Sequence, residues 1–210
     1  MPTPKESLAR SLHEAADHLV GRGHSDEALL EACDAVTGAN EILRNGEELS
    51  KEHRLLVFLS EMVGVLGARI PEDGEIFDAF AVSPFSGREN PLRPTHLEYR
   101  RVGDEIHGEM VAGIAYEGAT DRSHGGLTAA VFDDLMGALQ RIVGHQGFTR
   151  TLEVAYFGRV PTDDTVNLVA RLESFDGQTF TMAAEAIYEG ETVATATAVF
   201  TEVDFSELPS

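Results

Sequence analysis

The chain has 210 residues, of which 42% are hydrophobic, and its 16 basic and 36 acidic side chains give a formal net charge of −20. This apolar fraction is large enough for a folded core and excludes a disordered chain. Nucleic acid and anionic membrane surfaces are excluded as partners, because their phosphates would be repelled. An anionic small ligand would need a locally arranged set of arginines.

The location of the protein is suggested by three negative features. The sequence has no run of about 18 apolar residues that could span a membrane, and its first ten residues, MPTPKESLAR, lack the apolar core of a signal peptide. Its one cysteine, Cys33, cannot form an internal disulfide framework. We therefore expect a cytoplasmic protein made of one domain with an extension or of two small domains.

Three helices are predicted in the first third of the chain. Thr3 and Glu6 have the spacing of a capping box before the first helix, and Ser25 is placed to cap the second. The third is expected from about residue 47 to about residue 66. No carboxylate or cysteine lies at metal-ligand spacing from the four histidines of this region, so we expect them to face solvent or cap helices; they are His13, His18, His24 and His53.

The remainder of the chain predicts a sheet and one long helix. Residues 72–96 hold three prolines and two glycines and are expected to connect the two parts. A hairpin is predicted around Gly103-Asp104, and a helix over residues 124–143. Four strand-like segments follow, separated by turn residues, and are expected to be antiparallel neighbours. The long helix is the expected cover for the apolar face of this sheet.

The segment SHGGLTAAVFDDLMGALQ, residues 123–140, combines glycines with two carboxylates. Gly125 and Gly126 would open the predicted helix, where free N–H groups and the helix dipole suit a developing oxyanion; a plain glycine-rich cap is the alternative. Asp133 lies on a stripe of small residues, where a ligand can approach, whereas Asp134 interrupts the stripe of large apolar residues. We therefore interpret Asp133 as the candidate catalytic group and Asp134 as structural; the alternative is that both are ordinary acidic residues that form salt bridges nearby.

The spacing of these groups constrains how they can act. Gly125 and Asp133 would be about 12 Å apart along one helix at 1.5 Å per residue. They cannot act on the same carbonyl unless Asp133 comes from another protomer. Two antiparallel copies of the helix, related by a two-fold axis, would bring these groups together twice.

Three segments resemble one known family. YEGATDRSHGGLTAAVFDDLMG is similar to the hotdog-fold PaaI-like acyl-CoA thioesterases, which have Tyr-x-Gly, His-Gly-Gly and an acidic residue nine positions after the histidine; here that residue is Asp133. GFTRTLEVAYFGRVP resembles their next motif, with Thr149 and Tyr156, and SPFSGRENPLRP resembles the lead-in of some bacterial members. The likeness covers roughly residues 81–203, so the three helices lie outside it.

The resemblance implies an α+β hotdog fold, in which an antiparallel sheet wraps one long central helix. We divide the chain into an N-terminal helical extension, residues 1–72, and a hotdog thioesterase domain, residues 73–210. The family's activity is hydrolysis of an acyl-CoA thioester to a free acid and coenzyme A. No metal and no separate cofactor is implied, since coenzyme A is part of the substrate. A homodimer is implied, and pairing of dimers into a tetramer is left open.

The resemblance also assigns roles to residues. The thioester carbonyl would sit against the N–H groups of Gly125 and Gly126. Asp133 of the partner protomer would be general base or nucleophile, and Thr149 would position the water or the carboxylate, unless it is an ordinary polar strand residue. The expected substrate-binding residues are His124, Arg150 and Arg159, the two arginines as phosphate contacts with an exposed solubilising role as the alternative.

Two features separate this sequence from related enzymes. Many relatives have a Pro-Pro-Gly type loop before His-Gly-Gly, where this chain has Ala-Thr-Asp-Arg at 119–122. A hotdog enoyl-CoA hydratase is rejected, because Arg88 and Arg93 stand where that motif needs its Asp and His. A non-catalytic hotdog protein that binds acyl-CoA or another small ligand remains the alternative to an enzyme.

Overall fold

The structure is a computed structural model, and it describes residues 1–61, 69–81 and 83–203. Its helices are α1 (Pro4–Gly21), α2 (Asp26–Arg44), α3 (Lys51–Glu61), the 3₁₀ turn η1 (Ile114–Tyr116) and α4 (Gly125–Val143). Its strands are β1 (Ile76–Phe77), β2 (His96–Val102), β3 (Glu105–Val111), β4 (Glu117–Ala119), β5 (Arg122–Ser123), β6 (Gly147–Tyr156), β7 (Val166–Phe175), β8 (Thr179–Tyr188) and β9 (Glu191–Glu202).

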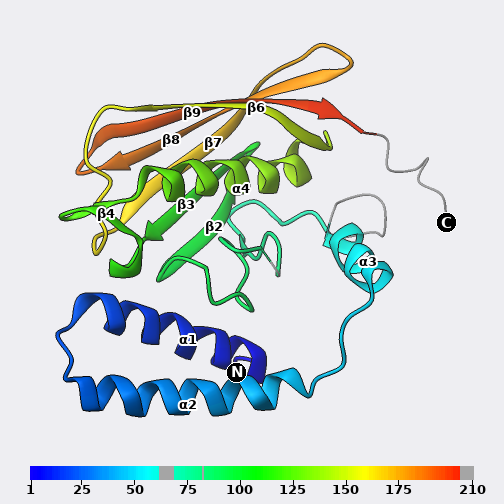
Figure 1. The fold of residues 1–210 in the computed structure, drawn as a ribbon. Coiled ribbons are helices and arrows are strands. Elements are labelled where there is room, and N and C mark those ends of the chain that lie inside the picture. Colours follow the sequence, from blue (N-terminus) through cyan, green and yellow to red (C-terminus); the bar gives the residue numbers. More distant parts are fainter. Residues whose placement is uncertain (62–68, 82, 204–210) are drawn as a thin grey trace.

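A main sheet and the helix α4 form the body of the molecule (Figure 1). Within the described residues the main sheet has seven strands in the order β1-β2-β3-β7-β8-β9-β6, all antiparallel, and β4 and β5 form a separate small ribbon. α4 lies across one face of the main sheet and contacts β3, β6, β7, β8 and β9. The predicted α+β hotdog fold is therefore confirmed.

The core lies between α4 and the main sheet. The largest side chains that are fully buried there are Tyr99, Phe132, Phe180, Phe200, Ile106, Met110, Leu135, Met136, Leu139, Leu168, Met182 and Val131. Burial of each large apolar side chain contributes about 1.5 to 3 kcal/mol relative to exposure. α4 is therefore the element on which this core depends.

The strand order differs from the prediction at one place. β7, β8 and β9 are antiparallel neighbours joined by short turns, as expected, but β6 pairs with β9 at the edge of the main sheet and not with β7. The physical reason is the length of the connection. Residues 157–165 join β6 to β7 and are long enough to cross the sheet, whereas a tight turn would have forced the two strands to pair.

The helical start signals were predicted correctly, and the third helix was not placed well. Thr3 forms a capping box with Glu6, and the Ser25 hydroxyl accepts a hydrogen bond from the Ala28 N–H. α3 begins at Lys51, later than predicted. Its predicted end falls on residues 62–68, which lie outside the described residues. No helix among the described residues is long and apolar enough to cross a membrane.

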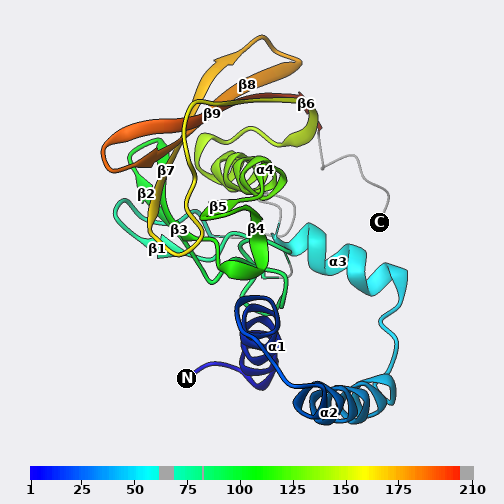
Figure 2. The ribbon, with the colours of Figure 1, turned by 60° about the vertical axis from the view of Figure 1, so that its left-hand side comes forward.

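α1 is attached to the hotdog body through polar groups. Asp17 accepts hydrogen bonds from the Ala115 N–H at 2.8 Å and the Thr95 hydroxyl at 3.2 Å. His13 is buried, with its Nε2 3.1 Å from Thr95 Oγ1 and 3.2 Å from Asp17 Oδ2. The expectation that His13 faces solvent is therefore wrong. The docked face of α1 buries Ala9 and His13 and leaves Leu8 and Leu12 exposed, so the spacing of its leucines could not locate this face. Figure 2 shows α1 beneath η1 and β4.

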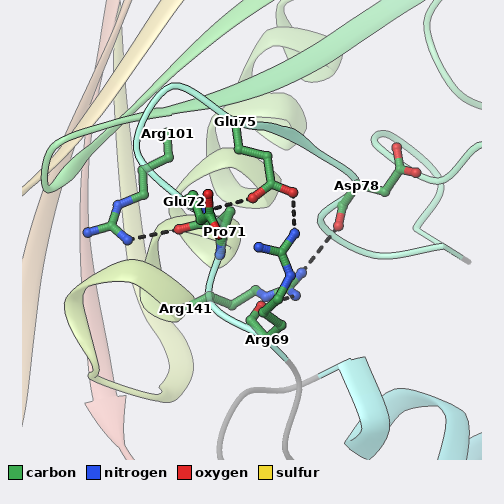
Figure 3. Close-up of polar contacts among 7 residues, drawn as sticks. All are labelled: Arg69, Pro71, Glu72, Glu75, Asp78, Arg101 and Arg141. Atoms are coloured by element: carbon green, nitrogen blue, oxygen red, sulfur yellow. Dashed lines mark hydrogen bonds and ion pairs between the residues drawn. The ribbon is translucent and has the colours of Figure 1, made fainter.

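The chain around residues 69–79, where the helical extension joins the hotdog body, is held to α4 by Arg141 (Figure 3). Arg141 donates hydrogen bonds to the carbonyl oxygens of Asp78 at 3.2 Å, Ala79 at 2.9 Å and Arg69 at 3.3 Å. Arg101 of β2 adds a bond to the Pro71 carbonyl at 2.8 Å. These hydrogen bonds position residues 69–79 beside the C-terminal end of α4, just before and around β1.

The attachment of α1 can be tested at Asp17. The substitution Asp17→Ala leaves the Ala115 N–H and the Thr95 hydroxyl without this acceptor and should lower the free energy of unfolding by about 1 to 3 kcal/mol. Hydrogen–deuterium exchange should become faster in peptides covering α1 and Ala115. Glu14→Ala, an exposed carboxylate on the same helix, is the matched control. Equal exchange in the two variants would contradict the polar attachment.

Candidate active site

The N-terminus of α4 is closed by the side chain that precedes it. His124 is the N-cap, and its Nδ1 accepts the Gly126 N–H at 2.9 Å, while the His124 N–H donates to the Tyr116 carbonyl at 2.7 Å. A Cβ at Gly126 would lie 2.9 Å from this Nδ1, so glycine permits the cap. The Gly125 N–H has no acceptor within the described part of the chain. It is the donor left available at this helix end.

Tyr156 covers the first residue of α4. Its hydroxyl donates to the Gly125 carbonyl at 2.5 Å, and a Cβ at Gly125 would lie 3.3 Å from that hydroxyl. Glycine therefore allows the end of β6 to approach the helix closely. Partial burial raises the pKa of Tyr156, so the hydroxyl keeps its proton and remains a donor.

Asp133 and Thr149 meet in the second half of α4. Thr149 Oγ1 donates to Asp133 Oδ1 at 2.8 Å. Thr149 pairs with Phe200 and Thr151 with Val199, so Arg150 is the extra residue of a β-bulge in β6. Bulges redirect neighbouring side chains. β6 thus contacts α4 at two points: Thr149 touches the carboxylate, and Tyr156 touches the first turn.

Asp134 has a different environment from its neighbour. Its carboxylate accepts hydrogen bonds from the Ser83 hydroxyl and from the Tyr99 hydroxyl, the latter at 3.0 Å. Burial raises the pKa of Asp134, and the hydrogen bonds from Ser83 and Tyr99 oppose this rise. Ser83 also accepts the N–H groups of Phe85 and Ser86 at 3.0 and 3.3 Å. Asp134 therefore anchors the 83–86 turn, in agreement with its interpretation as structural.

A pocket of about 400 Å³ opens beside the N-terminal half of α4. Its wall combines apolar and polar groups and consists of Phe85, Ala115, Tyr116, Glu117, His124, Gly126, Leu127 and Ala130. The Tyr116 hydroxyl donates to the Leu92 carbonyl, which fixes that side of the wall. The volume and the mixed lining are those of a small-molecule site. We call it the helix pocket.

The structure brings the predicted residues together in two groups. His124, Gly125 and Gly126 gather at the start of α4, and Asp133 and Thr149 are hydrogen-bonded farther along it. Gly125, Gly126 and Asp133 lie on the same helix, so the separation of the two groups along its axis follows from the positions of these residues in the sequence.

The predicted phosphate contacts lie outside these two groups. Arg150 is exposed on β6. Arg159 is also exposed, and its guanidinium lies 5.5 Å from the centre of the Tyr188 ring, with Nη2 3.3 Å from the Tyr188 hydroxyl. Within the described residues neither arginine contacts the start of α4 or Asp133, and their assignment as phosphate contacts stays a prediction.

The sequence left the roles of three site residues open. Tyr156 and Tyr116 were noted only as motif residues, and Phe85 only as part of the SPFSG turn. The structure places Tyr156 on Gly125 and puts Tyr116 and Phe85 in the wall of the helix pocket. Their positions within the family motifs were the only signal in the sequence that they belong to the site. Their contacts could not be predicted, because these depend on how β6 and the 83–86 turn cross α4.

Comparison with known proteins confirms the predicted resemblance. Residues 122–195 match the sequence model of the thioesterase superfamily. This segment contains α4, with all the candidate groups at its start, and β6 with Thr149. No curated protein matches the sequence.

A solved structure shares the fold over nearly the whole chain. This structure, described as a thioesterase superfamily protein, aligns with a TM-score of 0.76 at 17% identity, over 96% of this chain and 92% of that chain. A hypothetical thioesterase from Streptococcus pneumoniae, solved with coenzyme A, aligns at 0.49 and 18% identity over 52% and 88% of the two chains. The PaaI protein of E. coli aligns at 0.48 and 14% identity over 51% and 80%. Because the first of these alignments covers 96% of this chain, the likeness in fold includes the helical extension.

The burial of Asp134 predicts a pH effect. Its pKa in the folded state is raised above the unfolded value near 4, so the folded protein binds more protons between the two pKa values. The free energy of unfolding should therefore fall as pH rises from 4 through this range. Asp134→Asn does not titrate and should gain stability relative to the original protein over the same range, as measured by urea unfolding between pH 4 and 7.

The control for this experiment is Asp163→Asn, which removes the same charge from an exposed loop position. A stability difference between the original protein and Asp134→Asn that does not change with pH would contradict the raised pKa.

Proposed function

We propose that the protein is an acyl-CoA thioesterase whose active site is shared between two protomers. The observation that carries the proposal is the hydrogen bond between Thr149 and Asp133. Asp133 stands at the acidic position of the motif, within the segment that matches the thioesterase superfamily. A carboxylate held at one oxygen by a hydroxyl is suited to accept a proton from water or to attack a carbonyl.

The edge position of β6 supports a shared site. Within the described strands β6 pairs on one side with β9, and its other side is open. Two copies could pair through this edge about a two-fold axis between Leu152 and Glu153, midway between Thr149 and Tyr156. Thr149 with Asp133 would then face Tyr156 with Gly125 of the other copy. The exposed side chains of Tyr156 and Phe157, 48% and 68% accessible, would be partly covered by this pairing.

The proposed reaction gives one role to each of the three groups Gly125, Thr149 and Asp133. The thioester oxygen accepts a hydrogen bond from Gly125 N–H, since Gly126 N–H is engaged by His124. In the other protomer, Thr149 holds Oδ1 of the Asp133 of its own chain, and Oδ2 of that carboxylate takes a proton from the attacking water. The tetrahedral intermediate then breaks its C–S bond, and the coenzyme A thiolate leaves and is protonated. In the nucleophilic variant the carboxylate itself attacks and water cleaves the resulting anhydride.

The helix pocket is the proposed location of the group next to the thioester. Phe85, Leu127 and Ala130 give it an apolar wall, and its mouth includes Gly126. Arg150 and Arg159 remain the proposed contacts of the coenzyme A phosphates. The alternative is a protein that binds an acyl-CoA or another small ligand without hydrolysis. Pocket binding alone would not need the Asp133–Thr149 pair, which favours the enzyme.

The first kinetic prediction separates the two aspartates. With a panel of acyl-CoA substrates and a thiol reagent, Asp133→Asn should lower kcat by at least about 100-fold, because general acid–base groups contribute about 10² to 10⁴. Asp134→Asn should retain most of the activity, since its carboxylate anchors the 83–86 turn. Thr149→Val should lower kcat about tenfold, and Thr149→Ser should restore it.

Three outcomes would count against this assignment. Full activity in Asp133→Asn together with loss in Asp134→Asn would reverse the roles. Equal losses in Thr149→Val and Thr149→Ser would show that the hydroxyl is not used. Tight binding of an acyl-CoA without thiol release would favour the binding protein.

The second prediction tests the shared site. Asp133→Asn and Gly126→Val should each inactivate a homodimer. A heterodimer of the two variants, purified through different tags, should recover one intact site of its two, so that a random mixture regains about a quarter of the original activity. Gly126→Val is chosen because its Cβ would lie 2.9 Å from His124 Nδ1 and would displace the cap that orders the first turn around the Gly125 N–H. No recovery in a verified heterodimer would show that both groups act within one chain.

A further inference from the structure

A second pocket lies between α1 and residues 88–98. Its volume is about 590 Å³, and it shares no lining residue with the helix pocket. The ionisable side chains in its wall are Glu6, Arg10, His13, Arg88, Arg93, His96 and Glu98. We call it the arginine pocket. Because one wall is α1 and the other is the segment leading into β2, it exists only where the extension meets the hotdog body.

The two walls of the arginine pocket are fastened to each other. Lys5 Nζ lies 2.7 Å from Glu89 Oε2 near the start of α1. His13 Nε2 lies 3.1 Å from Thr95 Oγ1 farther along the same helix. A cavity held on both sides by such contacts is preformed, so a ligand need not order it on binding.

Two arginines of the pocket lack an ion-pair partner among the described residues. Arg88 forms an ion pair with Asp78 at 2.6 Å. Within the described residues no carboxylate lies at ion-pair distance from Arg10 or Arg93. The chain has 36 acidic side chains against 16 basic ones, so two guanidinium groups without acidic partners at one cavity stand out from the overall charge.

Arg93 is the more constrained of these two arginines. Its Nη2 donates to the Leu97 carbonyl at 3.0 Å, and its Nε is buried without an acceptor. Burial and the nearby charge of Arg88 lower the pKa of Arg93. A half-buried guanidinium beside a second one is unfavourable in the empty pocket. An anion would remove both costs, because it would supply acceptors and neutralise the charge.

We propose that the arginine pocket binds a small ligand through a dianionic oxyanion group, a phosphate or a dicarboxylate, held by Arg10 and Arg93. The ligand is small because the cavity is closed on two sides by α1 and the 88–98 segment. The site goes beyond thioester hydrolysis and does not depend on it. Its test is a binding measurement, so it can fail while the proposed activity stands, and the reverse also holds.

The experiment is isothermal titration of the full chain with inorganic phosphate and with malonate at constant ionic strength. We expect saturable binding with one site per chain. Arg93→Gln and Arg10→Gln should each weaken it at least about tenfold, because each removes a charge-assisted hydrogen bond. Arg44→Gln, at the exposed end of α2, makes the same change in net charge away from the pocket and should bind as the original protein does.

A further variant distinguishes a direct effect on anion binding from an effect of misfolding. Glu98→Gln removes a negative charge from the pocket wall and should tighten phosphate binding, a change that partial unfolding would not produce. Absence of binding to the original protein, equal weakening in Arg44→Gln, or unchanged binding in both pocket variants would overturn the proposal.

A titration with free coenzyme A identifies the source of the anion. If coenzyme A competes with phosphate and its binding also weakens in Arg93→Gln, the pocket receives phosphates of the substrate. If both bind without competition, the ligand is a separate small anion. Either result supports an oxyanion site in the arginine pocket.

Discussion

The packing of α4 against the main sheet determines where chemistry can occur in this protein. Most of the helix is enclosed, because its large apolar side chains fill the space under β3, β6, β7, β8 and β9. What remains accessible is its first turn and the narrow side that carries small residues and Asp133. Both are crossed by one strand, β6. The candidate groups therefore share a rigid frame, which suits a reaction that requires fixed geometry.

The two adjacent aspartates show how one helix serves stability and function together. Neighbouring helical residues point about 100° apart, so they meet different surroundings. Asp134 points to the turn at Ser83 and to Tyr99, and it holds the segment whose Phe85 lines the helix pocket. Asp133 points to β6 and remains partly exposed. The carboxylate of Asp134 thus helps to shape the cavity, whereas the carboxylate of Asp133, held at one oxygen by Thr149, is available to a ligand.

The sequence predicted those parts of the structure that depend on local patterns. The cap at Thr3, the hairpin at Gly103 and the helix over 124–143 follow from residues close together in the chain. The contact of Thr149 with Asp133 was anticipated only through family resemblance. The edge position of β6 and the burial of His13 were missed, because they depend on long-range pairing and on polar docking, which leave no periodic signal.

The bulge at Arg150 makes the spacing of β6 sensitive to chain length. Side chains alternate between the two faces of a strand, so one inserted residue reverses this alternation for the part of the strand beyond it. In β6 the extra residue falls between the part that carries Thr149 and the part that ends at Tyr156. Loss of Arg150 itself would remove the bulge and leave both halves paired as they are, whereas loss of a residue elsewhere in β6 would shift the pairing of one half with β9 by one position and turn that half away from α4. Among descendants of this sequence, single-residue deletions in β6 should therefore be rarer than substitutions at the same positions.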